Sequence, residues 1–361
     1  MDVEDKLALI KQVGEEIITE EDLKTLLSEK VHPIAYDGFE PSGTDIHIAQ
    51  GIMRAINVNK MTKAGIKFKM LVADWHGWAN NKMGGDLEKI QKVGKFYVEV
   101  WKHCGMDLKN VEFVWASDLL NNREYWKTVM QIARNSTLQR ILRTTQIMGR
   151  SESDALQASQ IMYPCMQAAD IFHLKADICQ LGMDQRRVSI LARELGPSLG
   201  YWKPVVVSHH MLMGLTQPVS NLSEKDAKER TIALKMSKSN PDSAIFMTDT
   251  KEDISRKLKK TWCPEGQTEE NPILEYFKYI IFEKFEAVII ERPEKYGGNL
   301  EIPSYREFEQ MFRDKNIHPM DAKNTAAVYI EKLISPVREK ILHDPKTREM
   351  REEIRAFEVT R

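Results

Sequence analysis

The feature that most constrains the fold is an alternation of two hydrophobic patterns between residue 33 and about residue 240. Short apolar runs alternate with longer stretches in which apolar residues repeat at helical spacing. This alternation predicts an α/β fold of Rossmann type, with a parallel sheet, helices on both faces and ligands at the carboxyl ends of the strands. Strands are expected at 33–39, 68–74, 111–115, 177–181 and 205–207, and helices at 87–101, 124–148, 153–169 and 184–195.

Polar residues follow three of these strands and are the first candidates for a site. Glu40 follows the first strand, His76 comes just after the second, and Asp184 and Gln185 follow the fourth. His76 is compatible with a pocket position and with a structural one, and both interpretations stay open. The helical stretch 118–160 interrupts the alternation and indicates an insertion.

The character of the chain changes after residue 246. Helical patterns cover 251–261, 272–286, 305–315 and 321–342, and 288–290 is the main β-branched run. We therefore predict three parts, which are a helical lead-in at 1–30, an α/β domain of Rossmann type at 31–246 and an all-α domain at 247–361.

Charge and composition limit the possible partners. The 361 residues carry 52 Lys and Arg against 53 Asp and Glu, a net charge of -1. This balance counts against an RNA partner unless the positive charge is segregated, and clusters at 140–150 and 256–260 allow that. The four cysteines form no C-x-x-C pair, which disfavours a disulfide framework and a zinc site. The N-terminus is charged and acidic, and no apolar run approaches the ~20 residues that span a bilayer, so we expect a cytoplasmic protein without membrane contact.

The most specific motif is Lys235-Met236-Ser237-Lys238-Ser239. Asn240-Pro241-Asp242-Ser243 follows it, so a loop is expected. Two ammonium groups on a loop could follow a pyrophosphate as charge builds on its oxygens. The alternative is an ordinary solvated loop.

A second motif lies far upstream. A strand, a turn at 40–43 and an apolar helical segment enclose His47-Ile48-Ala49-Gln50. Together the two motifs resemble the paired signatures of class I aminoacyl-tRNA synthetases. His47-Ile48 matches the first half of the family's His-Ile-Gly-His motif, whereas Ala49 and Gln50 depart from the second half.

A third pattern bears on the substrate. Tyr163, Gln167 and Asp170 are spaced 4 and 3 apart and would share one face of a helix. An exposed helix face is the alternative to a pocket. Together with 36–43 and 182–186, the triplet resembles the tyrosine-specific branch of these synthetases found in archaea and eukaryotes, and the match extends from about 15 to 345.

The resemblance implies ligation of L-tyrosine to tRNA(Tyr) through a tyrosyl-adenylate made from ATP, with Mg²⁺ carried by the pyrophosphate and no bound zinc. It also implies a homodimer built through 118–160. Tyr36 and Asp170 would bind the phenol, and Tyr163, Gln167 and Gln185 the ammonium group. His47, Lys235 and Lys238 would be catalytic. The residues implied around ATP are Glu40, His47, Gln50, Gly51, Gly182, Asp184, Met213, Lys235 and Lys238.

The helical domain resembles the family's anticodon-binding domain at 292–298 and 318–321. By that resemblance Tyr296 would stack on the first anticodon base, and Asp321 would accept hydrogen bonds from it beside His318. Helix capping is an alternative for Asp321 that is compatible with RNA contact. Arg186 would contact the acceptor end of the tRNA.

Three rival interpretations remain. A tryptophan-specific synthetase shares the chemistry, but Tyr36 and Asp170 suit a phenol better than an indole. A noncatalytic RNA-binding relative and another nucleotidyltransferase of the same fold are the other two. His209 and His210 are consecutive on a strand, so they would point to opposite faces and could not both bind one metal; each would be structural or near the adenine.

Overall fold

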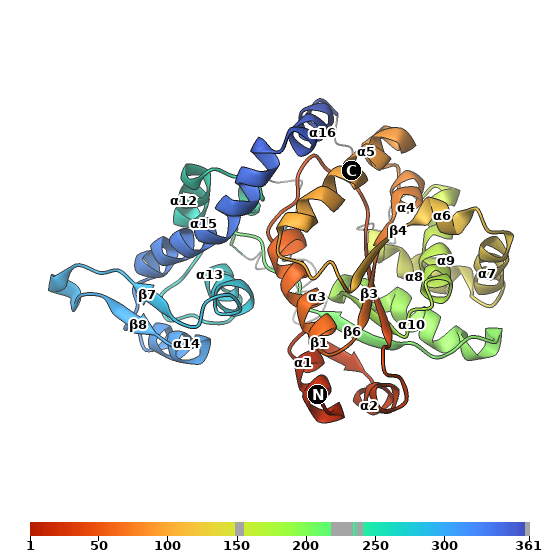
Figure 1. The fold of residues 1–361 in the computed structure, drawn as a ribbon, viewed down its shortest axis with the longest axis horizontal. Coiled ribbons are helices and arrows are strands. Elements are labelled where there is room, and N and C mark those ends of the chain that lie inside the picture. The colour runs from red at the N-terminus through yellow and green to blue at the C-terminus, as the bar shows by residue number, and fades with distance from the viewer. Residues whose placement is uncertain (149–154, 218–233, 235, 237–240, 358–361) are drawn as a thin grey trace.

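A mixed six-stranded sheet forms the centre of the molecule (Figure 1). The computed structural model describes residues 1–148, 155–217, 234, 236 and 241–357. The strand order is β1-β6-β5-β2-β3-β4, and every neighbouring pair is parallel except β1 with β6. The strands are β1 (Gly14–Ile18), β2 (Ile34–Phe39), β3 (Lys67–Val72), β4 (Val111–Trp115), β5 (Ile178–Gly182) and β6 (Val205–His209).

Two hydrophobic cores form on the two faces of this sheet because alternate strand residues point to opposite sides. Ala35 belongs to the first core, together with residues of α1, α3 and α5, whereas Tyr36 belongs to the second, with residues of α7, α9 and α10. The helices up to β6 are α1 (Val3–Lys11), α2 (Glu20–Glu29), α3 (Arg54–Lys63), α4 (Asp74–Ala79), α5 (Leu87–His103), α6 (Ala116–Leu120), α7 (Arg123–Arg134), α8 (Leu138–Thr144), α9 (Ala158–His173) and α10 (Arg186–Leu195).

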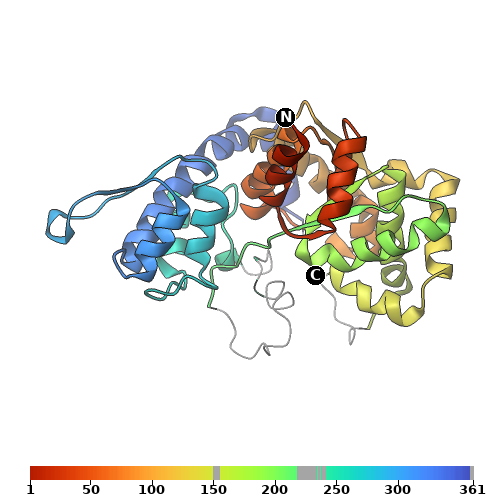
Figure 2. The ribbon, with the colours of Figure 1, turned by 90° about the horizontal axis from the view of Figure 1, so that it is seen from below.

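The C-terminal region is mainly helical and shares the first core with the sheet. It also contains an antiparallel pair of short strands, and this hairpin extends away from the rest of the molecule (Figure 2). The last helix returns to α5, where Lys346 binds Glu99 at 2.8 Å. The elements are α12 (Lys251–Lys260), α13 (Pro272–Tyr276), β7 (Val288–Ile290), β8 (Leu300–Ile302), α14 (Tyr305–Arg313), α15 (Pro319–His343) and α16 (Pro345–Arg355).

The observed elements follow the sequence patterns closely, with differences near the ends. The predicted strand at 111–115 coincides with β4, and the α/β fold with a following helical region is confirmed. Residues 14–18, expected in a helical lead-in, form β1 by pairing with β6. The partner strand lies almost two hundred residues away, so the local sequence did not indicate the pairing. The helical stretch 124–148 is divided among α7, α8 and a 3-10 turn at Thr145–Met148. Among the described residues, no helix is both long and apolar enough to cross a membrane.

The packing of α5 on the sheet makes a direct prediction about Gly94. A Cβ atom at this position would lie 2.9 Å from the Trp115 ring and 3.0 Å from Val72 Cγ1. Overpacking costs about 1 to 3 kcal/mol, more than the ~1 kcal/mol that Ala gains over Gly in a helix. We expect Gly94→Ala to lower the free energy of unfolding in urea, whereas Lys95→Ala on the exposed side of α5 should leave it unchanged. An unchanged or higher value for Gly94→Ala would contradict this packing.

Candidate active site

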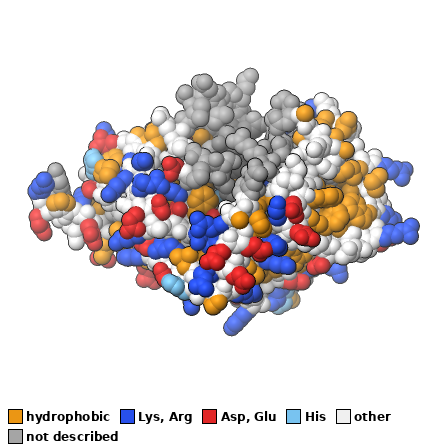
Figure 3. Space-filling model, turned by 90° about the horizontal axis from the view of Figure 1, so that it is seen from above, with side chains coloured by type: hydrophobic (Ala, Val, Ile, Leu, Met, Phe, Trp, Pro, Cys, Tyr) orange, Lys and Arg blue, Asp and Glu red, His pale blue; other side chains and the backbone are white. Residues whose placement is uncertain are grey.

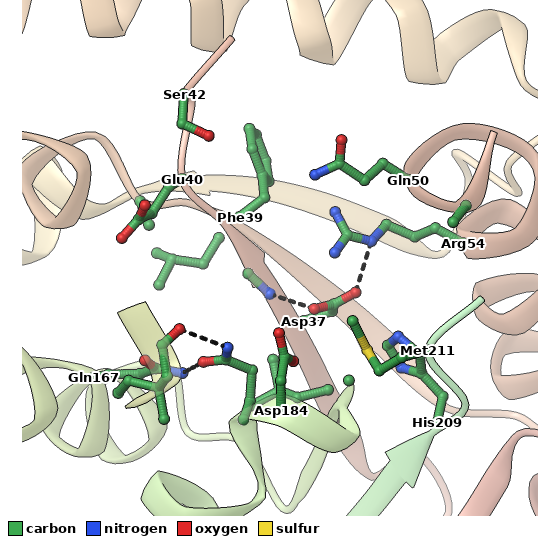
Figure 4. A pocket seen from close by; sticks show the side chains of 18 of the residues that line it. Asp37, Phe39, Glu40, Ser42, Gln50, Arg54, Gln167, Asp184, His209 and Met211 are labelled. Atoms are coloured by element: carbon green, nitrogen blue, oxygen red, sulfur yellow. Dashed lines mark hydrogen bonds and ion pairs between the residues drawn. The ribbon is translucent and has the colours of Figure 1, made fainter. Parts of the chain in front are cut away.

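A cavity of about 630 Å³ opens at the carboxyl ends of β2, β5 and β6, where the sequence placed a ligand site (Figure 4). Adjacent residues of β2 divide it. Tyr36 belongs to the core on the α9 side, whereas the Asp37 side chain meets Arg54 of α3. We call the part around Tyr36 and α9 the α9 half, and the part around Asp37 and α3 the α3 half.

A buried carboxylate is the centre of the α9 half. Asp170 is fully buried, accepts a hydrogen bond of 2.7 Å from the Tyr125 hydroxyl, and lies 2.9 Å from His76 Nε2. Burial opposes charge on His76, but the Asp170 carboxylate prevails and raises the pKa of His76 above its ordinary value. His76, whose role the sequence left open, therefore lines the cavity beside Asp170.

The hydroxyl of Tyr36 is buried in the same half. It makes no hydrogen bond of good geometry to any residue in the described part of the chain. Burial, and secondarily the charges around it, raises the pKa of Tyr36 well above its ordinary value, so the phenol stays protonated. A buried hydroxyl without a partner is costly, and a polar ligand group would satisfy it.

An amide pair lies beside these groups. Gln167 Nε2 donates to Gln185 Oε1 at 3.0 Å, and Gln185 Nε2 donates to the carbonyl of Ile147 at 3.0 Å (Figure 4). Gln167 Oε1 is buried and has no hydrogen-bond partner among the residues described. Tyr163 stands next to them with its ring 5.0 Å from His76, and its pKa is raised by burial and then by Glu40. Tyr163, Gln167 and Asp170 all line the cavity, which confirms that they share one face of α9.

An ion pair that the sequence did not predict occupies the α3 half. Arg54 Nε lies 2.8 Å from Asp37 Oδ2 (Figure 4). The guanidinium group also stands over the Trp101 ring, 5.5 Å from its centroid. Burial raises the pKa of Asp37 to about 6 although Arg54 acts to lower it. Arg54 lies four residues after Gln50, so helical spacing could have placed it near Gln50, but no pattern in the sequence indicates its partner Asp37.

The first signature motif lines the α3 half together with the described part of the second. His47, Gln50 and Met236 are all lining residues. Backbone bonds of 2.8 Å, from Ile48 N to Ile245 O and from Met247 N to Ile46 O, attach the first motif to the segment that follows the second. Lys235 and Lys238 lie outside the described residues.

Residues from the ends of β5 and β6 complete this half. Gly182, Asp184 and His209 line it, and Glu40 and Ser42, which follow β2, are also lining residues (Figure 4). His209 Nδ1 lies 2.6 Å from Gln180 Nε2. Burial, and next the charge of Arg54, lowers the pKa of His209 to about 3, so its ring is neutral.

Three residues predicted for the ATP site or the acceptor end of the tRNA are not among the residues that line the cavity. Gly51 faces Met247, and its missing Cβ would lie 2.8 Å from the sulfur. The backbone N–H of Met213 donates to Glu275 at 2.8 Å. Arg186 is paired with Glu16. Their roles stay predictions, as do those of the lining residues.

The residues predicted to contact the anticodon, Tyr296, His318 and Asp321, lie in the C-terminal region. Tyr296 ends the turn Glu294–Tyr296 between β7 and β8. His318 is exposed and caps α15, accepting a hydrogen bond of 3.1 Å from the Met320 backbone, and Asp321 lies in the first turn of that helix. The cap is therefore His318 and not Asp321.

Comparison with known proteins agrees with this geometry. A family model described as "tRNA synthetases class I (W and Y)" matches residues 28–335. The chain is 48% identical over 363 residues to tyrosine–tRNA ligase 1, cytoplasmic, of Arabidopsis thaliana, with 100% of this chain and 90% of the relative covered. Tyrosine–tRNA ligase 2, cytoplasmic, of the same plant is 46% identical across the whole chain, which spans 46% of its length. The solved structure of a tyrosyl-tRNA synthetase complexed with L-tyrosine from Pyrococcus horikoshii matches with a TM-score of 0.89 and 38% identity, covering 98% of this chain and 100% of that one.

The Asp37–Arg54 pair predicts a pH-dependent stability. Removing one partner of a buried ion pair costs about 3 to 5 kcal/mol because the other charge is left uncompensated. The folded-state pKa of Asp37, about 6, already exceeds its ordinary value of 3.8, and loss of Arg54 would raise it further. Arg54→Met should therefore lower the free energy of unfolding strongly at pH 8 and less at pH 5, where Asp37 takes up a proton.

The control for this measurement is Lys63→Met, which changes an exposed cation of α3. It should have little effect at either pH. The double variant Asp37→Asn/Arg54→Met should recover part of the loss at pH 8. An equal loss at both pH values for Arg54→Met would show that Asp37 does not depend on the guanidinium group.

Proposed function

The chain belongs to the class I tRNA synthetases for tryptophan and tyrosine, and we propose that it acts as a tyrosine–tRNA ligase whose α9 half binds the side chain of L-tyrosine. The observation that carries this assignment is the pair formed by Tyr36 and Asp170. Both are buried at the same end of the cavity, and the Tyr36 hydroxyl makes no hydrogen bond of good geometry to any described residue.

A phenol satisfies this pair better than the side chains of competing amino acids. The tyrosine O–H would donate to Asp170, which has lone pairs left after binding Tyr125, and its oxygen would accept from Tyr36. Phenylalanine would leave both groups buried without that partner, at a cost of about 1 to 3 kcal/mol for each group. An indole N–H could donate to Asp170, but it offers no acceptor to Tyr36.

The polar groups beside this pair suit the rest of the amino acid. Gln167 Oε1 is an acceptor without a partner in the described part of the chain, and an ammonium group of the substrate would fill that role. Gln185 holds the Gln167 amide in place, and Tyr163 closes the same side. The tyrosine carboxylate would then point toward the α3 half.

We assign ATP to the α3 half. The tyrosine carboxylate oxygen attacks the α-phosphorus, forming an O–P bond as the bond to pyrophosphate breaks. The chain needs no nucleophile of its own, so catalysis rests on positioning and on stabilising phosphate charge. His47 lines the cavity and would take that role, and by resemblance Lys235 and Lys238, which lie outside the described residues, would share it; Glu40, Gln50, Gly182 and Asp184 line the cavity for the remaining contacts.

Mg²⁺ fits this scheme as a companion of ATP. Mg²⁺ is a hard cation that commonly binds through substrate phosphates, so we propose that phosphate oxygens of ATP supply ligands to it. In the second step a hydroxyl of the terminal adenosine of tRNA(Tyr) attacks the tyrosyl carbonyl and AMP leaves. We place this activity in the cytoplasm, as the names of the Arabidopsis relatives indicate for those proteins.

The tRNA would contact both ends of the molecule. We propose that residues 31–246 form the catalytic domain and 247–361 the anticodon-binding domain. In the latter, Tyr296 lies at the tip of the β7–β8 hairpin, and His318 and Asp321 lie at the start of α15. Arg186 would have to exchange its bond to Glu16 for one to the acceptor end.

Amino-acid-dependent exchange of pyrophosphate into ATP tests the substrate. We expect exchange with tyrosine and none with tryptophan or phenylalanine. Asp170→Asn keeps the side-chain shape but removes the charged acceptor, and should lower kcat/KM for tyrosine about 10- to 100-fold, with a far smaller change in KM for ATP. Lys238→Ala should slow exchange with tyrosine because a phosphate contact is lost.

The matched control is Asp118→Asn, which changes an exposed carboxylate and should leave exchange intact. Exchange with tryptophan would mean that the pocket assignment is wrong. No exchange with any amino acid would favour the noncatalytic RNA-binding interpretation.

We further propose a homodimer formed through 118–160. Large apolar side chains are exposed there, including Trp126, Met130 (59% exposed) and Leu138 (62%). Hydrophobic side chains gather on the side of the molecule that carries α4 and α6–α9 (Figure 3). Such a patch is typical of a protein interface.

The double variant Met130→Glu/Leu138→Glu should shift the protein from dimer to monomer, because charges at the centre of an apolar interface stay desolvated. Light scattering coupled to gel filtration would measure the mass. Val328→Glu, a similar change at an exposed apolar residue of α15, is the control and should stay dimeric. A dimer in the double variant would place the interface elsewhere.

A further inference from the structure

A histidine outside the assigned chemistry joins three parts of the chain. His210 follows β6, and its Nδ1 lies 3.2 Å from a carboxylate oxygen of Glu15 in β1. Its Nε2 lies 3.1 Å from Glu275 in α13, and its ring stacks on Tyr279 with centroids 4.3 Å apart. The N-terminal strand, the sheet and the C-terminal region therefore meet on one imidazole ring.

The surroundings of His210 favour the protonated ring, because a carboxylate oxygen lies within ion-pairing distance of each ring nitrogen. Burial opposes the charge, yet Glu15 and Glu275 raise the pKa of His210 to about 9. Three other titratable groups lie nearby: Lys278, Tyr279 and His209. The charge of Lys278 acts on Glu15, and the pKa of His209 is lowered. The two consecutive histidines both line the cavity but differ in charge, since His209 is neutral and His210 is protonated.

Glu275 holds the backbone as well as the ring. Its Oε2 accepts a hydrogen bond of 2.8 Å from Met213 N and lies 3.1 Å from His210 Nε2. Residues 210 and 213 are thereby fixed to one carboxylate of the C-terminal region. Met211 and Leu212, which lie between them, line the α3 half.

The same segment makes backbone hydrogen bonds to the second signature motif and to residues on either side of it. Leu212 O accepts a hydrogen bond of 2.9 Å from Met236 N, and Gly214 N donates at 2.9 Å to Leu234 O. Leu215 N donates to Ser243 O at 3.0 Å. Whatever fixes residues 210–215 therefore also fixes one wall of the α3 half.

We propose that Glu275 and protonated His210 form a clamp through which the C-terminal region positions the nucleotide wall of the active site, a role that rests on the proposed function. His210 lines the cavity together with Met211 and Leu212, and Glu275 is the group of the C-terminal region that holds these residues in place, so Glu275 is a positioning residue. The clamp acts on ATP and not on tyrosine, because the Tyr36–Asp170 pair belongs to the opposite core and draws its partners from α4, α7 and α9.

The test compares Michaelis constants for the two substrates in the intact protein. Glu275→Gln keeps the size of the side chain and leaves one acceptor oxygen, but that oxygen cannot replace a carboxylate facing both His210 and Met213. His210→Gln removes the cation. We expect each variant to raise KM for ATP in pyrophosphate exchange about 10-fold and to change KM for tyrosine less than 2-fold. Glu286→Gln, an exposed carboxylate of the same region, is the control.

The double variant and a pH series separate positioning from general damage. Because both residues act through one contact, His210→Gln/Glu275→Gln should be no worse than the more affected single variant. In the wild type, KM for ATP should rise as pH passes about 9, where His210 loses its proton, and His210→Gln should lack that rise.

Two outcomes would overturn the clamp. One is an unchanged KM for ATP in Glu275→Gln, and the other is a parallel rise in both constants with a lower unfolding temperature, which a purely structural role would produce. If the wild type exchanges with no amino acid, the proposed function fails on its own, and calorimetric titration with ATP still tests the clamp. Equal ATP affinity in wild type and variants, or no ATP binding at all, would then reject it.

Discussion

The alternation of side chains along β2 is the constraint on which the site depends. Because neighbouring residues of a strand point to opposite faces, Tyr36 enters the core formed with α9, and Asp37 meets Arg54 of α3. A register shift of one residue would exchange these two environments and leave the carboxylate among apolar groups. The order of two residues in one strand therefore fixes which half of the cavity carries the Tyr36 hydroxyl, where we propose that the phenol binds, and which carries the Asp37–Arg54 pair, where we propose that ATP binds.

Each buried charge in this region is compensated by a residue from a distant segment. Asp170 depends on Tyr125 and His76, Asp37 on Arg54, and His210 on Glu15 and Glu275. Leaving any of these groups unpaired would cost more than most single contacts contribute, so the pairs select the native arrangement of helices around the sheet. They also leave the Tyr36 hydroxyl and Gln167 Oε1 without partners among the described residues, and these are the atoms that face the cavity.

Local patterns were enough to predict the α/β fold, the strand at 111–115 and the shared face of Tyr163, Gln167 and Asp170, because each depends on periodicity within a short segment. The strand at 14–18 was missed because its stability comes from pairing with β6 and not from its own sequence. The Asp37–Arg54 pair and the surroundings of His210 were missed for the same reason, since a side chain's partner across the fold leaves no local signal. Met213 was assigned to the ATP site by the family resemblance alone; its N–H binds Glu275, and its role at ATP stays a prediction.

The shared hydrophobic core explains how the C-terminal region can act on the α3 half of the cavity. A region joined to the sheet by a hinge alone would move without changing the cavity, but here residues of α13 and α15 pack in one continuous cluster with α3 and α5. Close-packed interiors have low compressibility and transmit strain. A rigid contact between packed elements therefore passes on a displacement that a flexible loop would absorb. Glu275 is such a contact, because one oxygen meets both the His210 ring and the Met213 backbone. A displacement of α13 would reach Met211 and Leu212 before it reached any residue of the α9 half. The α3 half is therefore the part of the cavity that a movement of the C-terminal region would change first.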